Sequence, residues 1–195
     1  MEWDQYWTKG TWMTRLVDWA HRCYFSKIFA SRVAQFVRPR SLVLDAGCGT
    51  GVTSRRLHES TQSAIVGLDI SLPALRISSR YLPDTIRGDL QHLPFKSECF
   101  DVVYNQGVME HFPSPWQAAE DFTRVLRRNG LVILLVPYSF SPLRFAYVLL
   151  KTLRMLRFWI GEEQTFLSKN DLLRLLRLVD CRPILIDNVW LTTLL

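Results

Sequence analysis

An acid and three closely spaced glycines follow a short apolar run in the stretch LVLDAGCGTGVT, residues 42–53. The run ends on Asp45, and the glycines stand at positions 47, 49 and 51. Glycine accepts backbone conformations with positive φ and lets a ligand approach without a Cβ in the way. A helix that follows such a loop directs its amino-terminal N–H groups at the same place. The stretch therefore predicts a binding loop for a flat, polar ligand.

The spacing of these glycines disfavours two common nucleotide sites. A dinucleotide-binding loop has the pattern GxGxxG, which from Gly47 and Gly49 would place the third glycine where the chain has Val52. A triphosphate-binding loop would end in Gly-Lys followed by Ser or Thr, and the stretch does not contain that sequence. Neither NAD nor a nucleoside triphosphate is the expected ligand.

The stretch VLDAGCGTG resembles motif I of the class I S-adenosylmethionine-dependent methyltransferases. Later segments resemble the other motifs of this family in the same order, namely AIVGLDIS at 64–71, GDLQHLPF at 88–95, FDVVYNQGVMEHF at 100–112 and VLRRNGLVILLVP at 125–137. The resemblance covers residues 41–137 well and the rest of the chain only loosely. It implies a small-molecule methyltransferase, similar to the methyltransferase-11 group, with S-adenosyl-L-methionine as its cofactor.

The resemblance also implies roles for residues at the ends of the expected strands. Asp69 would hold both ribose hydroxyls, because a carboxylate can accept two hydrogen bonds at once. Asp89 would accept a hydrogen bond from the adenine amino group, with Leu90 beside the ring, and Asn105 would face the methionine part. The implied cofactor-binding residues are Asp45, Ala46, Gly47, Cys48, Gly49, Gly51, Asp69, Ile70, Asp89, Leu90 and Asn105.

His111, in the segment MEHF, is the candidate catalytic residue. The cofactor's sulfonium already activates the methyl group, so the main task of the protein is to hold an acceptor in line with it. A base is needed only where the acceptor loses a proton, and imidazole titrates near neutrality. The alternative that His111 only shapes the pocket stays open. No cysteines and histidines have the spacing of a zinc site, so no metal is expected.

Apolar runs alternate with helix-like segments along the chain, which predicts a Rossmann-like doubly wound, mostly parallel α/β sheet with helices on both faces. The expected strands are Leu42–Leu44, Ala64–Leu68, Thr85–Arg87, Val102–Tyr104 and Leu131–Val136, and the expected helices span 52–60, 71–82, 114–130 and 168–180. Ser114, with Pro115 after it, and Ser168 would begin the last two of these helices, and Asn129-Gly130 would end the helix over 114–130. Ligands of such sheets bind at the carboxyl ends of the strands.

A length of 195 residues suits one methyltransferase domain, 1–195. We divide it into an N-terminal helical lid (1–38), a cofactor-binding core (41–137), an amphipathic helical insertion (138–167) and a last helix and strand (168–195). The aromatic residues Trp3, Tyr6, Trp7 and Trp12 would either form a lid over the cofactor or pack the first helix onto the domain. The end of the chain would form either a hairpin at Asp187-Asn188 or one strand of an incomplete C-terminal strand pair.

Composition bears on compartment and partners. The balance of 48% hydrophobic and 22% charged residues is that of a soluble globular protein, and four widely spaced cysteines favour a reduced, cytoplasmic compartment. A net charge of +6 is a modest attraction for anions. The basic amphipathic segment 143–160 could lie on the inner membrane surface as a peripheral contact, cap the acceptor site, or pack as an ordinary helix on the domain or on a second subunit. The sequence leaves the oligomeric state open.

The expected function is methyl transfer to a small-molecule acceptor, which could be apolar or lipid-linked. A nucleic-acid base is not expected, because NQGV stands where such enzymes carry Asn- or Asp-Pro-Pro-aromatic. The alternative is a non-catalytic cofactor-binding subunit that acts through partner contact. A third reading, a basic nucleic-acid binder, would show affinity that falls steeply with salt.

Overall fold

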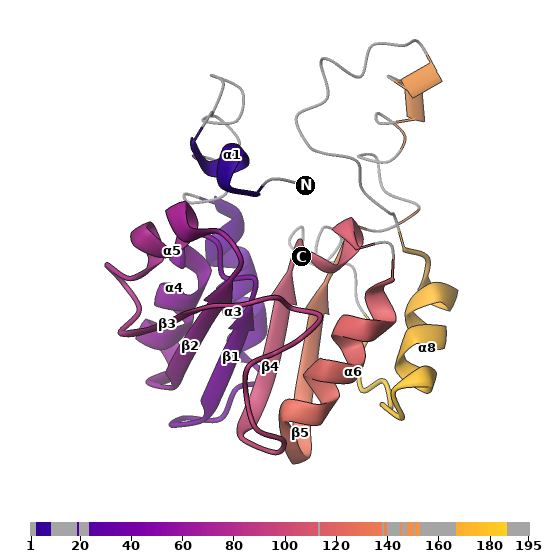
Figure 1. The fold of residues 1–195 in the computed structure, drawn as a ribbon. Helices are drawn as coiled ribbons and strands as arrows, with labels where there is room; N and C mark the ends of the chain where they lie inside the picture. Colours follow the sequence, from indigo (N-terminus) through magenta and orange to yellow (C-terminus); the bar gives the residue numbers. More distant parts are fainter. Residues whose placement is uncertain are drawn as a thin grey trace.

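The computed structural model describes residues 3–8, 19, 24–112, 114–137, 139, 145, 148–149, 151–152 and 167–186. Within these residues, five strands form one parallel sheet in the order β3-β2-β1-β4-β5 (Figure 1). The strands are β1 (Leu42–Ala46), β2 (Ala64–Asp69), β3 (Asp84–Arg87), β4 (Phe100–Gln106) and β5 (Leu126–Leu135). The order reverses at β1, and such a switch point is where ligands bind in parallel sheets. The predicted Rossmann-like parallel sheet is confirmed.

Helices cover both faces of this sheet (Figure 1). One face carries α3 (Ser26–Ala34) and α4 (Val52–Thr61), and the other carries α6 (Pro115–Val125) and α8 (Lys169–Leu178). The connection from β2 to β3 contains α5 (Leu72–Ser78), and a short 3-10 turn, η2 (Met109–His111), follows β4. Helix α1 (Trp3–Thr8) lies beside α5 at the carboxyl ends of the strands (Figure 1).

Neighbouring residues of the strands point to opposite layers of the core, as the pleat of a strand requires. Val43 and Ile65 pack with α3 and α4, whereas Leu44 and Leu68 pack with α6 and α8. All four side chains are buried. Because both faces are covered, the strands are continuous apolar runs in the sequence, which is what allowed their prediction.

The start of α8 confirms the predicted Ser168 cap. The Ser168 hydroxyl accepts a hydrogen bond from the Asp171 N–H at 3.2 Å, and the Asp171 carboxylate accepts one from the Ser168 N–H at 2.8 Å. This reciprocal capping box satisfies two backbone donors of the first turn. Further along α8, the Leu175 side chain is buried in the core and packs with residues of α6.

The expected helix over 114–130 is shorter than predicted. Pro115 begins it as expected, although the Ser114 side chain makes no capping hydrogen bond. The helix ends at Val125, and the chain enters β5 directly. The prediction that Asn129-Gly130 ends the helix is wrong, because both residues lie within β5.

A bulge near the start of β5 explains this error. Phe100 pairs with Leu126, but Val102 pairs with Leu131, so four residues of β5 oppose a single residue of β4. Asn129 has a φ of 62° there, a left-handed conformation that asparagine tolerates. Asn-Gly therefore marked a position of positive φ correctly, but the same signal serves a helix end and a strand bulge.

Several expectations fall on parts of the chain that the structure does not describe. Most of the segment 143–160 and all of 187–195, with the two readings of the C-terminal strand pair, lie outside the described residues, as does Trp12. Residues 181–186 are described and form neither helix nor strand. Among the helices that the structure describes, none is long and apolar enough to cross a bilayer.

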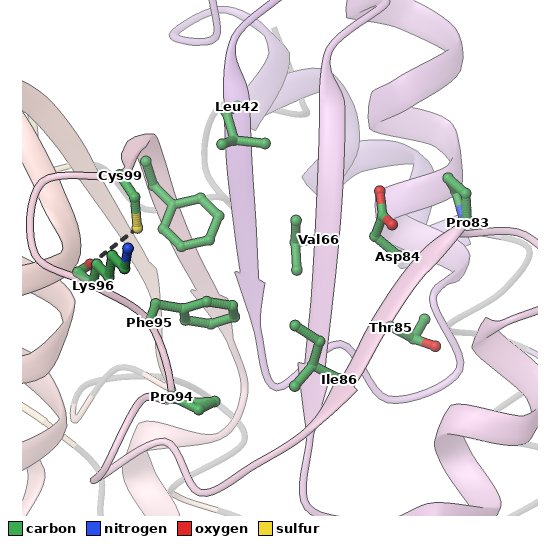
Figure 2. A pocket seen from close by; sticks show the side chains of 11 residues that line it. Leu42, Val66, Pro83, Asp84, Thr85, Ile86, Pro94, Phe95, Lys96 and Cys99 are labelled. Atoms are coloured by element: carbon green, nitrogen blue, oxygen red, sulfur yellow. Dashed lines mark hydrogen bonds between the residues drawn. The ribbon is translucent and has the colours of Figure 1, made fainter.

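A hollow of about 540 Å³ lies against the sheet at the amino ends of β1, β3 and β4 (Figure 2). Residues 88–99, which connect β3 to β4, contain no helix, and Pro94 and Phe95 of this connection line the hollow together with Leu42 and Val66 of the sheet. Most of the lining is apolar, and the Cys99 thiol in its wall donates to the Lys96 carbonyl at 3.1 Å. The hollow is at the opposite end of the strands from the glycine loop.

Candidate cofactor-binding site

The glycine loop follows β1 in the backbone conformation that its sequence predicts. Gly47, Gly49 and Gly51 have φ values of 92°, 51° and 72°, a region in which a residue with a Cβ is strained. The N–H groups of Gly47 and Cys48 donate to the Leu68 carbonyl at 2.8 and 2.9 Å. The loop is therefore fastened to β2 and lies across the carboxyl ends of β1 and β2.

Two of these positions also need glycine because of close neighbours. A Cβ on Gly47 would lie 2.6 Å from Val108 Cγ2, in the turn after β4, and a Cβ on Gly51 would lie 2.9 Å from Cβ of Ser78 in α5. The Cys48 side chain is turned beneath the loop toward Gly67 and Ser78. Burial raises the pKa of this thiol well above its ordinary value, which argues against a nucleophile.

We expect Gly47→Ala to destabilise the protein by more than the strain of a positive φ, which is about 1–2 kcal/mol. The additional loss comes from displacing Val108. Gly107→Ala is the matched control, because Gly107 has a φ of 69° but the nearest atom to its added Cβ would be 3.7 Å away. Urea denaturation of both variants measures the difference, and equal losses would show that the contact with Val108 is unimportant.

Asp69 stands at the end of β2 and faces the glycine loop. Its Oδ2 accepts a hydrogen bond from the Gly49 N–H, and its Oδ1 accepts one from the Ser71 N–H, each at 2.8 Å. Burial raises the pKa of Asp69, and these backbone donors act against that rise. Each carboxylate oxygen has two acceptor positions, so both remain able to accept a hydroxyl donor. The geometry is compatible with the predicted grip on a diol.

The residues predicted to surround adenine occupy the β3 side of the site. Ile70 follows Asp69 and is 45% exposed, and Arg87 Nε donates to its carbonyl at 3.0 Å. Asp89 is part-exposed and accepts from the Gln91 N–H at 2.9 Å. Leu90 is buried in the core beside them. Ile70 thus offers an apolar surface, and Asp89 keeps an acceptor near it.

The side chains of Asp45 and Asn105 make hydrogen bonds to other groups of the protein. Asp45 is 2% exposed, and its Oδ2 accepts hydrogen bonds from the hydroxyl groups of Ser54 and of Tyr104, the latter at 2.7 Å. Burial raises the pKa of Asp45 to about 7. Asn105 donates to the Ala46 carbonyl and accepts from the Met109 N–H at 3.3 Å. Both side chains therefore support the loop from below.

Ser54 and Tyr104 were missed as members of the site. Ser54 in α4 and Tyr104 in β4 are polar residues at positions that face the core of the protein. A buried hydroxyl group needs a hydrogen-bond partner. A polar side chain at a core-facing position was the signal available in the sequence. It indicated only that each hydroxyl has a buried partner, and the structure shows that Asp45 is that partner for both.

Helix α1 covers three parts of the site. Trp7 lies on the glycine loop, with Cζ2 3.1 Å from the position of a Cβ on Gly49. Asp4 Oδ1 accepts from the Ser71 hydroxyl at 2.8 Å, next to Asp69. Trp3 packs edge-on against His111 with ring centroids 5.2 Å apart. These contacts are compatible with both readings of the N-terminal aromatics, as a lid and as residues that pack the first helix onto the domain.

Residues 44–134 match a family model described as a methyltransferase domain. This segment is a methyltransferase domain of the class I S-adenosylmethionine-dependent type. A malonyl-[acyl-carrier protein] O-methyltransferase of Herminiimonas arsenicoxydans is 34% identical over 112 residues, covering 56% of this chain and 43% of the relative. A sterol 24-C-methyltransferase of Schizosaccharomyces pombe is 29% identical over 127 residues, covering 56% and 34%. The chain thus spans less than half the length of these curated relatives.

Solved structures share the fold of this chain. A possible histamine N-methyltransferase of Thermotoga maritima superimposes with a TM-score of 0.63 at 23% identity, covering 85% of this chain and 78% of that one. The methyltransferase from a Haloferax volcanii complex with the Trm112 activator gives a TM-score of 0.68 at 19% identity, covering 91% and 75%. At these identities the likeness shows the fold alone.

The residues of this site fit S-adenosyl-L-methionine, the cofactor of the family. Gly49 presents a backbone without a Cβ beneath the Trp7 ring, and Asp69 beside it can still accept hydrogen bonds from a ribose diol. Ile70 supplies an apolar surface on the adenine side. Among the described residues, no group of three His, Cys, Asp or Glu side chains could hold a metal ion.

Proposed function

We propose that the protein transfers the methyl group of S-adenosylmethionine to a small-molecule acceptor. The observation that carries the proposal is the 2.8 Å hydrogen bond from the Gly49 N–H to Asp69 Oδ2, which joins a glycine loop to an acid at the switch point of the sheet. The names of the relatives, which refer to a malonyl group on a carrier protein and to a sterol, support a small-molecule acceptor, and the sterol supports an apolar one. They do not favour the alternative of a non-catalytic binding subunit.

Different residues of the site would bind the nucleoside and position the acceptor. The backbone of the glycine loop and Asp69 would hold the nucleoside, with Ile70 and Leu90 beside the base. When bound, S-adenosylmethionine supplies a methyl group that a positively charged sulfur already activates. Trp3 and Trp7 of α1 would exclude water and fix the approach of the acceptor, and such positioning can lower a barrier by roughly 7–11 kcal/mol.

The acceptor is identified by incubating the protein with methyl-labelled S-adenosylmethionine and a fractionated small-molecule extract. Mass spectrometry should detect a metabolite that gains the labelled methyl group. A protein heated to destroy its fold is the control. Binding of the cofactor without any labelled product in the fractions would contradict methyl transfer to a small molecule and would favour the binding-subunit alternative.

We expect His111→Ala to lower turnover about tenfold and to leave cofactor affinity nearly unchanged. His111 lies past the end of β4 and touches α1 through Trp3, so it would face the acceptor rather than the nucleoside. His58→Ala is the control. His58 lies in the last turn of α4, where its ring contacts the Ser63 carbonyl rather than the site. Steady-state assays and calorimetry separate the two effects. Full activity of His111→Ala from pH 6 to 9 would show that the residue only packs.

The location that we propose is the cytoplasm, with peripheral contact at the inner membrane surface through residues 143–160. Three described residues of that segment support an exposed apolar face: Phe145 is 76% exposed, and Val148 and Leu149 are about half exposed. Lys151 follows them and is also exposed. An apolar face with adjacent basic residues suits either an anionic membrane or an apolar acceptor.

A further inference from the structure

Glu110 is a buried acid for which neither the sequence motifs nor the cofactor site provides a role. It lies in η2, immediately before His111, and is 3% exposed. Its Oε2 is completely buried, and among the described residues it has no hydrogen-bond partner. A buried carboxyl oxygen without a partner destabilises a fold, so its presence calls for an explanation.

The order of the strands shows which end of the site Glu110 occupies. Asp69 ends β2, and the predicted adenine surface lies on the β3 side of it. A ligand held there by its ribose extends the other way, over the β1 loop and toward β4. Glu110 lies just past the end of β4, and Val108 in the same turn contacts Gly47 of the loop.

Helix α1 packs on both the glycine loop and the turn after β4. Trp7 packs on Gly49 of the loop, and Trp3 packs on His111, the residue next to Glu110. The Glu110 carboxyl group lies by the turn that follows β4, with Oε1 3.7 Å from the position of a Cβ on Gly107. This is the end of the site opposite the predicted adenine surface, where the sulfur and its methyl group would lie. Its side chain is shielded from solvent, since Glu110 is only 3% exposed.

We propose that Glu110 takes the proton that an O–H or N–H acceptor loses during methyl transfer. This inference rests on the proposed function. The acceptor atom forms a bond to the methyl carbon, the carbon–sulfur bond breaks with its electron pair going to sulfur, and the acceptor's proton moves to Oε2 of Glu110. The carboxyl group returns this proton to solvent when the products leave.

The electrostatic surroundings of Glu110 suit this task. Burial raises its pKa to about 7, and a hydrogen bond from its own backbone N–H acts in the opposite direction. Among the described residues, no charged side chain contributes to this shift. The titratable residue next to it in the turn is His111. The other acids around the site are engaged elsewhere: Asp4 on α1 is bonded to Ser71, and Asp45 below the loop is bonded to Ser54 and Tyr104.

A positive charge placed beside such a carboxyl favours its ionised form. S-Adenosylmethionine carries a sulfonium charge that its product, S-adenosylhomocysteine, lacks, while both carry the same amino and carboxylate groups. Binding of the first should therefore release the proton of Glu110, and binding of the second should not. The comparison needs no knowledge of the acceptor.

Calorimetric titration at pH 7 in two buffers of different ionisation enthalpy measures this release. The wild type should release about half a proton more with S-adenosylmethionine than with S-adenosylhomocysteine, because a group with a pKa of about 7 is half protonated there. Glu110→Gln should abolish the difference. Glu120→Gln, which changes an exposed acid on α6, should preserve it, and so should His111→Asn.

Equal proton release by the two ligands in the wild type would overturn the proposal. So would a difference that persists in Glu110→Gln or that disappears only in His111→Asn. If Glu110→Gln does not fold, the wild type decides alone, because its difference should vanish at pH 9, where the carboxyl is already ionised, and a difference that remains there would refute the proposal. Failure of both ligands to bind would instead refute the proposed function.

Discussion

Replacing Asp69 with alanine is expected to weaken the binding of S-adenosylmethionine about 100-fold. The carboxylate faces the glycine loop and keeps acceptor positions on both oxygens. Hydrogen bonds to a charged group contribute about 1.5–3 kcal/mol each, and the loss of two is offset in part by water. A net loss of about 2.7 kcal/mol corresponds to a factor of about 100 in the dissociation constant.

Calorimetric titration of the variant and of Asp84→Ala measures this effect. Asp84 is an exposed acid at the start of β3, so its replacement changes the net charge equally at the far end of the strands. Asp69→Asn adds a second comparison, because an amide oxygen can still accept from the Gly49 N–H while the charge is lost. Wild-type affinity in Asp69→Ala would contradict the assignment of the ribose site.

The free energy of unfolding is expected to fall as the pH rises from about 5 to 8. Burial raises the pKa of both Asp45 and Glu110 to about 7, whereas their ordinary values are 3.8 and 4.5. Between these values the folded protein holds protons that the unfolded chain has released. The resulting stabilisation is complete below the ordinary values and is lost as the pH passes 7, with a magnitude on the order of 3 kcal/mol for each group.

Urea denaturation at several pH values between 5 and 8 tests this expectation. Glu110→Gln should make the decline shallower, and the control Glu120→Gln should leave it unchanged. Asp69 adds to the trend, because burial also raises its pKa. Asp101 and Asp121 have lowered pKa values and act below about pH 4, outside this window. A stability that does not change between pH 5 and 8 would show that neither carboxyl is held protonated by the fold.

The sequence predicted the centre of the sheet well because burial on both faces leaves a continuous apolar run. Val102–Tyr104 was found as a strand and extends to Phe100–Gln106. The glycine loop was equally readable, since positive φ at Gly47 and Gly49 leaves few other residue choices. The start of β5 was not, because Asn129-Gly130 gives the same signal for a helix end and for a bulge.

Local patterns did not reveal the partners of Asp45. Ser54 and Tyr104 are 9 and 59 residues from it along the chain, and only the packing of α4 and β4 around β1 brings their hydroxyls to one carboxylate. Glu110 was missed for a related reason. A short turn has no periodicity from which to read burial, so an acid there looks exposed until the neighbouring elements are placed around it.

The three contacts of α1 have a consequence for the timing of the reaction. A nucleoside that enters or leaves must pass a helix that is held by Trp3 on His111, Asp4 on Ser71 and Trp7 on Gly49. As the proposed lid, α1 would open on microsecond to millisecond timescales, and such motions often set the turnover rate. The residence time of spent cofactor, rather than the chemical step, is therefore expected to pace this enzyme, so that a looser helix would give weaker binding and faster cycling together.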